Sequence, residues 1–255
     1  MVWARDTEAR ELMDAPDADL AALHRTYARF APLNRLVSGW RALYRRQLRH
    51  RGAELRVLDV GCGGADVARA LLRWSRRDGL HWSVLGIDPD ARAIEWARAR
   101  PEPGLSLRAA HSAELDEPFD LIISNHVLHH LSPSELTTLL ADSERLLAPG
   151  GLALHSDLER SRVAFAVFGA VTWPLQDGPL RGSFIRPDGL TSIRRAYTAA
   201  ELRSITPPDW RVDRAAPARL HLRFEKPGNL RVELAGRVGA QHRIETSPRT
   251  PPAPA

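Results

Sequence analysis

Glycines and acidic residues in one short stretch of this chain have the spacing needed to hold a small ligand. In the stretch Leu55–Asp66, an apolar run ends in glycines at Gly61, Gly63 and Gly64. Glycine adopts positive φ angles and lets the backbone approach a ligand closely. The helix start that follows offers free N–H groups to a carboxylate or a phosphate. The pattern therefore predicts a strand, a tight turn and a helix, which either bind a ligand or form an ordinary turn.

A second candidate, Asp88, lies 27 positions after Gly61 and ends the apolar segment 82–88. This spacing is somewhat longer than the value of about 20 that is typical of the ribose-binding acid in dinucleotide folds. A carboxylate at the end of a strand can accept hydrogen bonds from both hydroxyls of a ribose. The alternative is a solvent-facing turn residue before Pro89, but the upstream glycine turn favours the ligand-binding interpretation.

Three histidines, His126, His129 and His130, follow the apolar segment 119–124. Ligands in open α/β sheets bind at the carboxyl ends of strands, and the pKa of histidine suits a general base. We therefore treat His126 and His129 as candidate bases, with helix capping or packing as the alternative. A metal site is not predicted, because no carboxylate or cysteine accompanies the histidines at ligand spacing. Tyr27 is a further candidate to orient a substrate hydroxyl, or else a packing aromatic.

The elements that must position these residues alternate along the chain. Apolar runs predict strands that include 57–60, 82–88, 105–109, 119–124 and 152–155, with amphipathic helices between them. Ser132-Pro-Ser-Glu135 is a capping box with proline at the first helical position. Two further strand candidates, 210–214 and 220–224, suggest an antiparallel hairpin at the sheet edge. The pattern predicts an α/β fold with a parallel sheet wound on both faces.

The flanking segments have weaker patterns. A helix is predicted from Asp17 until Pro32 ends it. A second helix presents a row of arginines that is a solvated face or a contact for an acidic substrate or a membrane surface: Arg41, Arg45 and Arg49. The regular alternation is lost over 161–197, and a long insertion of this kind is often a functional lid. The proline-rich stretch 247–255 is predicted to be disordered.

The composition restricts the function classes. The net charge of +5 is spread along the chain of 255 residues rather than gathered in one run, so no nucleic-acid partner is predicted. The single cysteine, Cys62, excludes an internal disulfide. The apolar run 163–173 is too short to span a bilayer, and the N-terminus lacks a signal peptide's apolar core. We expect a cytoplasmic protein without stable membrane insertion. The oligomeric state is not predicted.

Four segments together resemble the class I S-adenosylmethionine-dependent methyltransferases. They are Val-Leu-Asp-Val-Gly-Cys-Gly-Gly (57–64), Gly-Ile-Asp-Pro-Asp (86–90), Phe-Asp-Leu-Ile-Ile-Ser-Asn-His-Val-Leu-His-His-Leu (119–131) and Arg-Leu-Leu-Ala-Pro-Gly-Gly (145–151). The segment 27–39 is similar to the N-terminal part of the ubiquinone/menaquinone-biosynthesis methyltransferases. The resemblance implies a Rossmann-like, doubly wound, seven-stranded sheet, mostly parallel with an antiparallel C-terminal edge strand, under a helical N-terminal lid. The expected domains are a cap (1–52), the methyltransferase domain (53–226, with a lid insertion at about 160–197) and a partly disordered tail (227–255).

The resemblance also implies S-adenosylmethionine as the cofactor and a set of cofactor-binding residues: Asp59, Gly61, Cys62, Gly63, Asp66, Asp88, Pro89, Ser112, Ala113, Ser124 and Asn125. Two positions depart from the family pattern. Ala65 stands where many members have a third glycine. Ser112 stands where members commonly have an aspartate that binds the adenine amino group, although a serine hydroxyl also accepts a hydrogen bond.

The function implied is methyl transfer to a small, partly hydrophobic metabolite of phenolic, quinone-like or polyketide type, at oxygen or carbon. Alternatives are a nucleic-acid or protein methyltransferase, or a regulatory protein that binds the cofactor without turnover. An NAD-linked oxidoreductase is less favoured, because Gly-Cys-Gly-Gly-Ala (61–65) lacks the G-x-G-x-x-G spacing.

Overall fold

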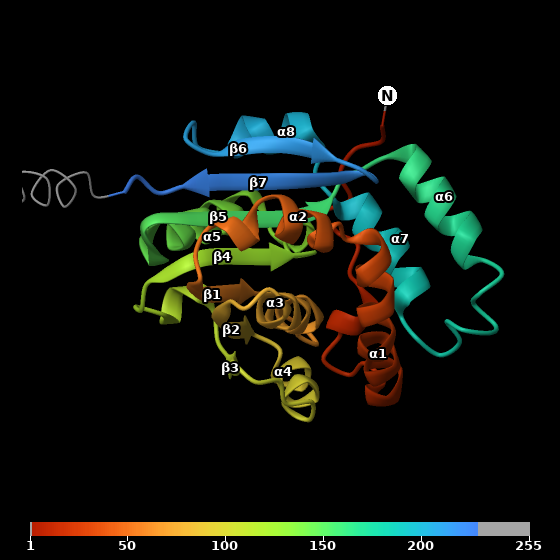
Figure 1. Ribbon diagram of the computed structural model, residues 1–255. Helices are drawn as coiled ribbons and strands as arrows, with labels where there is room; N and C mark the ends of the chain where they lie inside the picture. The colour runs from red at the N-terminus through yellow and green to blue at the C-terminus, as the bar shows by residue number, and fades with distance from the viewer. Residues whose placement is uncertain (1, 229–255) are drawn as a thin grey trace, which may run out of the picture.

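The computed structural model describes residues 2–228, with the side chains of residues 33 and 35–37 left out. Its centre is a seven-stranded sheet in the order β3-β2-β1-β4-β5-β7-β6 (Figure 1). The strands are β1 (Glu54–Val60), β2 (His81–Asp88), β3 (Leu105–Ala109), β4 (Phe119–Asn125), β5 (Leu147–Leu158), β6 (Arg211–Ala215) and β7 (Arg219–Glu225). The predicted doubly wound, mostly parallel sheet with an antiparallel C-terminal edge is confirmed. The predicted disordered stretch 247–255 lies outside the described residues.

The strand register gathers the candidate residues at one edge of the sheet. Strands β1 to β5 run parallel, so the carboxyl ends of β1, β2 and β4 meet at this edge. Strand β7 runs antiparallel to β5, and Arg219 pairs with Leu158. The beginning of β7 therefore lies beside the carboxyl ends of β4 and β5. This arrangement brings a residue from the far C-terminal part of the domain to the predicted site.

Helices cover both faces of the sheet. On one face, α2 (Trp40–Arg46), α3 (Asp66–Arg77) and α4 (Ala91–Arg98) form a core with β1 and β2. On the other face, α5 (Pro133–Leu146) and α8 (Ala199–Ile205) pack against β4, β5 and β7. The apolar residues of each helix face the sheet, which removes their hydrocarbon surface from water. Helix α5 begins with the predicted Ser132–Glu135 capping box. In the described residues, no helix combines the length and apolar character needed to cross a membrane.

The N-terminal segment corrects one sequence expectation. Helix α1 spans Leu20–Val37 with Asp19 as its N-cap, and Pro32 lies inside the helix rather than at its end. A proline removes one N–H donor from the helix interior. The last turn is nevertheless held by tertiary contact, since Asn34 donates a hydrogen bond to Asp66. The helix ends at Val37, with Ser38 as its C-cap before Gly39, which has a φ of 75°.

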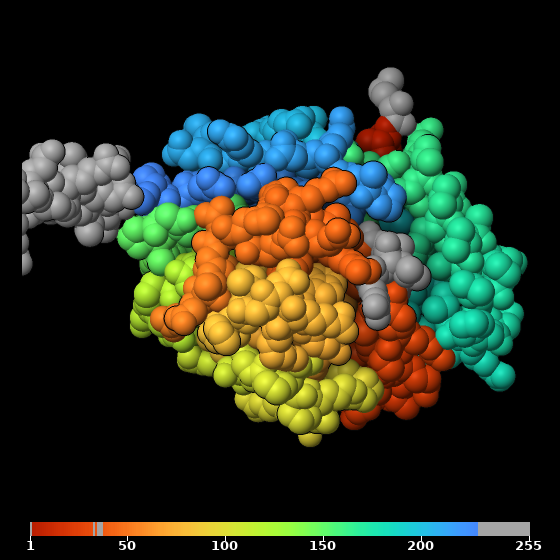
Figure 2. Space-filling model, viewed as in Figure 1, coloured from red at the N-terminus to blue at the C-terminus, as the bar shows by residue number. Residues whose placement is uncertain are grey.

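The insertion after β5 interrupts the alternation of strands and helices, as the sequence predicts. The chain forms two helices in succession, α6 (Arg162–Thr172) and α7 (Ile185–Arg195). The loop between them lies against α1, because Arg25 and Arg29 donate hydrogen bonds to the carbonyls of Gly182 and Arg181. Figure 2 shows this insertion, in green to teal, along one side of the molecule next to the N-terminal helix. Short 3-10 helices complete the fold: η1 (Leu12–Asp14), η2 (Leu48–His50), η3 (Ser112–Glu114) and η4 (Leu128–His130).

Candidate cofactor and active site

The glycine turn between β1 and α3 has the backbone geometry that the sequence predicts. Gly61 and Gly63 have positive φ angles of 65° and 51°. A Cβ atom at Gly61 would lie 2.5 Å from Cγ2 of Val127, so only glycine fits there. Ala65, at the position of the missing third glycine, also has a left-handed φ of 58°, which costs an L-residue about 1–2 kcal/mol. The turn therefore keeps the glycine-like backbone although one glycine is replaced.

Asp88 joins this turn to the second strand. Its Oδ2 accepts a hydrogen bond from the Gly63 N–H at 2.8 Å, and its Oδ1 accepts one from the Asp90 N–H at 2.9 Å. Burial raises the pKa of Asp88 against these two hydrogen bonds. Each carboxylate oxygen has a second lone pair, so the group still has capacity for two hydroxyl donors. The turn and the acid at the strand end are thus joined through one carboxylate that keeps free acceptor capacity.

Two more acidic residues lie near the turn. Asp59 is buried in β1, and its pKa is raised by burial and by the nearby carboxylates of Asp66 and Asp88. The carboxylate of Asp66 accepts a hydrogen bond from Nδ2 of Asn34 at 2.9 Å, and burial raises its pKa. Three desolvated acids in one region favour a cationic ligand, because a positive charge stabilises their ionised forms. The ammonium and sulfonium groups of the implied cofactor have this charge.

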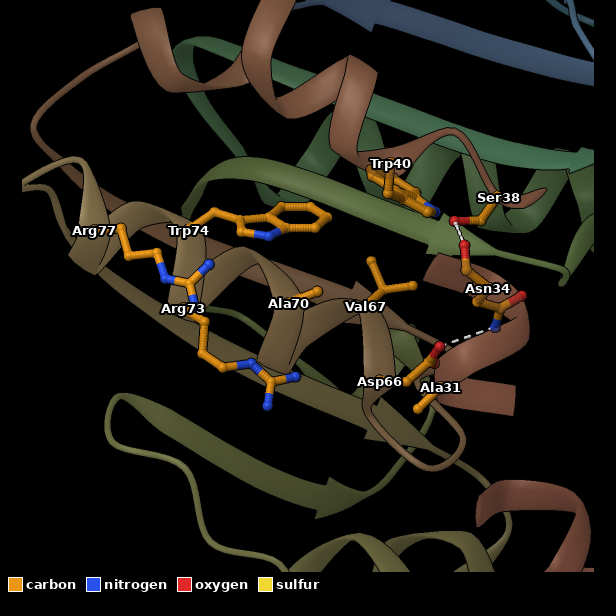
Figure 3. A pocket seen from close by; sticks show the side chains of 10 residues that line it. All are labelled: Ala31, Asn34, Ser38, Trp40, Asp66, Val67, Ala70, Arg73, Trp74 and Arg77. Carbon is orange, nitrogen blue, oxygen red and sulfur yellow. Dashed lines mark hydrogen bonds between the residues drawn. The ribbon is translucent and has the colours of Figure 1, made fainter. Parts of the chain in front are cut away.

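Figure 3 shows the contact between Asp66 and Asn34 at the edge of a cleft between α1, α2 and α3. The cleft is lined by Ala31, Asn34, Ser38, Trp40, Asp66, Val67, Ala70, Arg73, Trp74 and Arg77. It does not include the glycine turn or Asp88. Those residues are covered by α1 instead, where the buried Tyr27 has its Cε1 atom 4.0 Å from the Cβ position of Gly63. Helix α1 therefore lies against the glycine turn.

The predicted adenine-binding residues, Ser112 and Ala113, lie in η3 after β3. The Ser112 hydroxyl donates a hydrogen bond to Oδ2 of Asp142 at 2.7 Å, and Arg145 donates to Oδ1 of the same carboxylate at 3.0 Å. An ionised carboxylate only accepts hydrogen bonds, so the hydroxyl proton of Ser112 is committed to Asp142. The remaining lone pairs of Ser112 are the ones available to an adenine amino group.

At the end of β4, the side chain of Ser124 is buried, with its Oγ 2.8 Å from Nδ1 of His155. The Asn125 side chain accepts a hydrogen bond from Arg219 through Oδ1 at 2.6 Å. The Ser124 hydroxyl and the side-chain oxygen of Asn125 thus have partners within the protein. Contacts of Ser124 and Asn125 with a cofactor through their backbone groups stay a prediction.

His126 has an unusual backbone and an unexpected partner. Its φ angle is 63°, a left-handed conformation that is uncommon outside glycine and often found at functional sites. Nη1 of Arg219 donates a hydrogen bond to Nε2 of His126 at 3.2 Å. Burial and the charge of Arg219 lower the pKa of His126 to about 3, so the imidazole is neutral at physiological pH.

His129 lies between two carboxylates that are distant in sequence. Its Nδ1 contacts Oδ1 of Asp157 at 2.8 Å, and its Nε2 contacts Oε1 of Glu11 at 3.1 Å. Burial opposes the charge of the imidazole, but the two carboxylates outweigh burial and raise the pKa of His129 to about 10. The side chain is therefore a cation with both nitrogens engaged. In this geometry His129 does not offer the lone pair that a general base needs.

The fold thus supplies carboxylates that the sequence argument against a metal site did not find. Glu11 and Asp157 come to within ligand spacing of the histidines: their ligand atoms lie within 4.8 Å of those of His129 and of His130 or His126. Asp157 lies near the carboxyl end of β5, and an acid at such a position can be recognised in the sequence as a candidate site residue. Nothing in the local sequence pattern distinguishes Glu11.

The third candidate catalytic residue, Tyr27, is a buried residue of α1. Burial and the neighbouring Asp88 raise the pKa of its phenol, so Tyr27 keeps its proton at neutral pH. Tyr197 donates a hydrogen bond to the Leu131 carbonyl and receives one from Arg5. Arg5 also donates to the carbonyl of His129. The N-terminal segment therefore contributes both Arg5 and Glu11 to this region, and neither was found from the sequence.

Comparison with known proteins gives a consistent result. The family model of a methyltransferase domain matches residues 22–204. The chain is 32% identical over 159 residues to the ubiquinone biosynthesis O-methyltransferase of Chelativorans sp. (strain BNC1), covering 58% of each chain. It is 35% identical over 120 residues to the protein of the same name from Maricaulis maris (strain MCS10), covering 44% of each chain. The matching region spans less than two thirds of these relatives.

Solved structures with low sequence identity share the fold. The plantazolicin methyltransferase BpumL, in complex with SAH, aligns with a TM-score of 0.59 at 16% identity and covers 85% of this chain and 92% of its own. A second structure, a DhpI–SAH complex, aligns with a TM-score of 0.53 at 19% identity over 82% of this chain and 95% of its own. The fold seen here is therefore shared with these solved structures.

Proposed function

Because the chain belongs to the methyltransferase-domain family, we propose that it transfers a methyl group from S-adenosylmethionine to a small, partly hydrophobic metabolite. The observation that carries this proposal is the hydrogen bond between the Gly63 N–H and the Asp88 carboxylate, at 2.8 Å. It joins the glycine turn and the acid at the end of β2 into one cradle. A bound S-adenosylmethionine supplies an electrophilic methyl group on a sulfonium.

The residues around the cradle have separate roles in binding. Asp88 and the adjacent Pro89 receive the ribose and flank the adenine, while Gly61, Cys62 and Gly63 follow the methionine portion with their backbone. The remaining predicted contacts are the acids of the turn, the adenine-side residues and the end of β4: Asp59, Asp66, Ser112, Ala113, Ser124 and Asn125. The desolvated acids near the turn support a ligand of positive charge.

The proposed acceptor is a phenolic, quinone-like or polyketide-type compound, methylated at oxygen or carbon. Support comes from the names of the curated relatives, ubiquinone biosynthesis O-methyltransferases, with which the chain shares about a third of the aligned residues. The positive side chains near the end of β4, Arg5, Arg195 and Arg219, favour an acceptor with an acidic hydroxyl. Methyl transfer itself depends mainly on alignment of the acceptor with the methyl group and on exclusion of water. A cytoplasmic location belongs to the same proposal.

Two measurements test the proposed function. Calorimetry should detect binding of S-adenosylmethionine and of its demethylated product, with no binding of NAD. Incubation with labelled S-adenosylmethionine and a panel of catechols and hydroquinones should then give labelled product with at least one acceptor. Binding of NAD in place of S-adenosylmethionine would contradict the cofactor assignment. Tight cofactor binding without turnover on a broad acceptor panel would favour the regulatory alternative.

A further inference from the structure

The contact between Arg219 and His126 determines which nitrogen of His126 carries its proton. A guanidinium has five N–H donors and no acceptor, so Nε2 of His126 must accept the hydrogen bond that Nη1 of Arg219 donates at 3.2 Å. A neutral imidazole has one N–H, and that proton must then be on Nδ1. Nδ1 has no hydrogen-bond partner among the described residues. His126 therefore has a blocked lone pair and a free N–H donor.

Arg219 is itself held firmly in this position. Its side chain is only 1% exposed at the beginning of β7, the strand between β5 and the edge strand β6. The other donors of the guanidinium reach Oδ1 of Asn125 at 2.6 Å and Oγ of Ser156 at 3.1 Å and 3.2 Å. None of these hydrogen-bond partners is a carboxylate. Burial lowers the pKa of Arg219 to about 10, although the nearby charge of Asp157 opposes this shift. A buried arginine without a direct carboxylate partner is costly for stability, which points to a function for the charge at this place.

We propose that Arg219 is a positioning residue that holds His126 as the neutral Nδ1–H tautomer, so that His126 acts as a hydrogen-bond donor and the methyl acceptor binds as an anion. This inference rests on the proposed methyltransferase function and specifies the substrate class of the same site: compounds with an acidic hydroxyl that ionise without help from His126. It replaces the predicted role of His126 as a base.

The charged groups around His126 agree with this role. Four elements place such groups near the ring: Arg219 on β7, Asp157 on β5, His129 on η4 and Glu11 in the N-terminal segment. Both nitrogens of His129 are engaged by carboxylates. The carboxylates of Glu11 and Asp157 have lowered pKa values and are weak bases, because the hydrogen bonds and charge of His129 outweigh their burial. No strong base is therefore present beside His126 in the described residues.

If the acceptor binds as an anion, methyl transfer needs no base to remove a proton. For an oxygen acceptor, a lone pair of the oxyanion forms the new O–C bond. The methyl–sulfur bond breaks at the same time and its electron pair stays on sulfur. The negative acceptor and the positive sulfonium give two neutral products, so no proton has to leave in this step. A neutral N–H donor from His126 can hold the oxyanion in line without neutralising it.

The tautomer is tested first, because this readout needs neither cofactor nor turnover. The full chain is labelled with ¹⁵N-histidine, and the His126 signals are assigned by their loss in His126→Gln. Long-range ¹H–¹⁵N spectra should show a protonated Nδ1 and an unprotonated Nε2, unchanged between about pH 5.5 and about pH 8. His129, protonated on both nitrogens, is an internal reference. An Nε2–H tautomer, or a His126 that titrates in this range, would overturn the proposal.

Two substitutions of Arg219 test whether this residue fixes the tautomer of His126. In Arg219→Met the donor to Nε2 is lost, so the tautomers should mix and the pKa of His126 should rise by about one unit or more. Arg219→Lys keeps a donor and a charge, and should restore most of the wild-type spectrum. An unchanged His126 spectrum in a folded Arg219→Met protein would contradict the role of Arg219. If that variant does not fold, the wild-type spectrum alone decides.

The acceptor's protonation state is tested by kinetics with catechol and the more acidic 4-nitrocatechol. The acidic limb of the pH dependence of kcat/KM should move with the pKa of the phenol, because the anion is the bound form. A limb at the same pH for both phenols would indicate an enzyme base and refute this part. If neither phenol is methylated although S-adenosylmethionine binds, the proposed acceptor class fails, whereas the tautomer of His126 is still decided by the spectra.

Discussion

Glu11 offers the sharpest test of how the N-terminal segment is attached to the site. Its carboxylate is 5% exposed and contacts Nε2 of His129 at 3.1 Å. The same oxygen, Oε1, accepts a hydrogen bond from the Ser192 hydroxyl at 2.7 Å. Burial alone would raise the pKa of Glu11, but the hydrogen bond and charge of His129 lower it to about 2. Glu11→Gln removes this charge with little change in shape.

The loss of stability expected for Glu11→Gln follows from the burial of the ion pair between Glu11 and His129. Removal of one partner of a buried ion pair costs about 3–5 kcal/mol, because the other charge is left without compensation. Here His129 keeps Asp157 as a second partner, so we expect the lower end of that range, about 3 kcal/mol. For a chain of this size the melting temperature should fall by about 6–12 °C.

The pKa shifts of His129 and Glu11 predict how the stability cost of Glu11→Gln depends on pH. His129 has a folded pKa raised from 6.5 to about 10, so its contribution is complete below pH 6.5 and is lost as the pH rises through about 10. Glu11 has a folded pKa lowered from 4.5 to about 2, so its contribution is complete above pH 4.5 and is lost as the pH falls through about 2. The stability difference between wild type and Glu11→Gln should therefore be greatest between pH 4.5 and pH 6.5.

Urea denaturation at about pH 5.5 and about pH 9.5 measures this difference in the free energy of unfolding. Glu8→Gln is the matched control, since Glu8 is an exposed residue of the same segment and should change stability by less than about 0.5 kcal/mol at either pH. The reasoning is refuted if Glu11→Gln costs no more than the control. It is also refuted if the cost is equal at the two pH values.

Three further substitutions test the cofactor site. Asp88→Ala should weaken binding of S-adenosylmethionine in calorimetry by at least tenfold, about 1.4 kcal/mol, and unchanged affinity would remove Asp88 from the ribose site. Gly61→Ala should lower both stability, by about 1–3 kcal/mol, and cofactor affinity in thermal and calorimetric measurements, because its Cβ would meet Val127 at 2.5 Å. In the wild type, Ser112 donates its hydroxyl proton to Asp142, so it can only accept a hydrogen bond from adenine. Asp142→Asn removes this restriction and should reduce the preference for S-adenosylhomocysteine over its inosine analogue. An unchanged ratio of the two dissociation constants would contradict this.

Much of the fold was predictable because its signals are local. The turn at 61–64 follows from glycines after an apolar run, and helix α5 follows from a capping box beside a stripe of leucines. Such patterns act over a few residues, so they can be interpreted without the rest of the chain. One local signal gave a wrong prediction. Pro32 was expected to end the first helix, but α1 continues to Val37, and Asn34 in its last part is held by a hydrogen bond to Asp66.

The sequence by itself determined the doubly wound sheet, the glycine turn and the acid at the end of β2, since strand and turn propensities are short-range. Only the tertiary structure decided the chemical state of the histidines. His129 is a cation because Asp157 and Glu11 enclose it, and His126 is neutral because it is buried and faces Arg219. These partners lie between 28 and 118 positions away along the chain. Protonation depends on burial and on charges brought together by folding, and no local pattern encodes either of them.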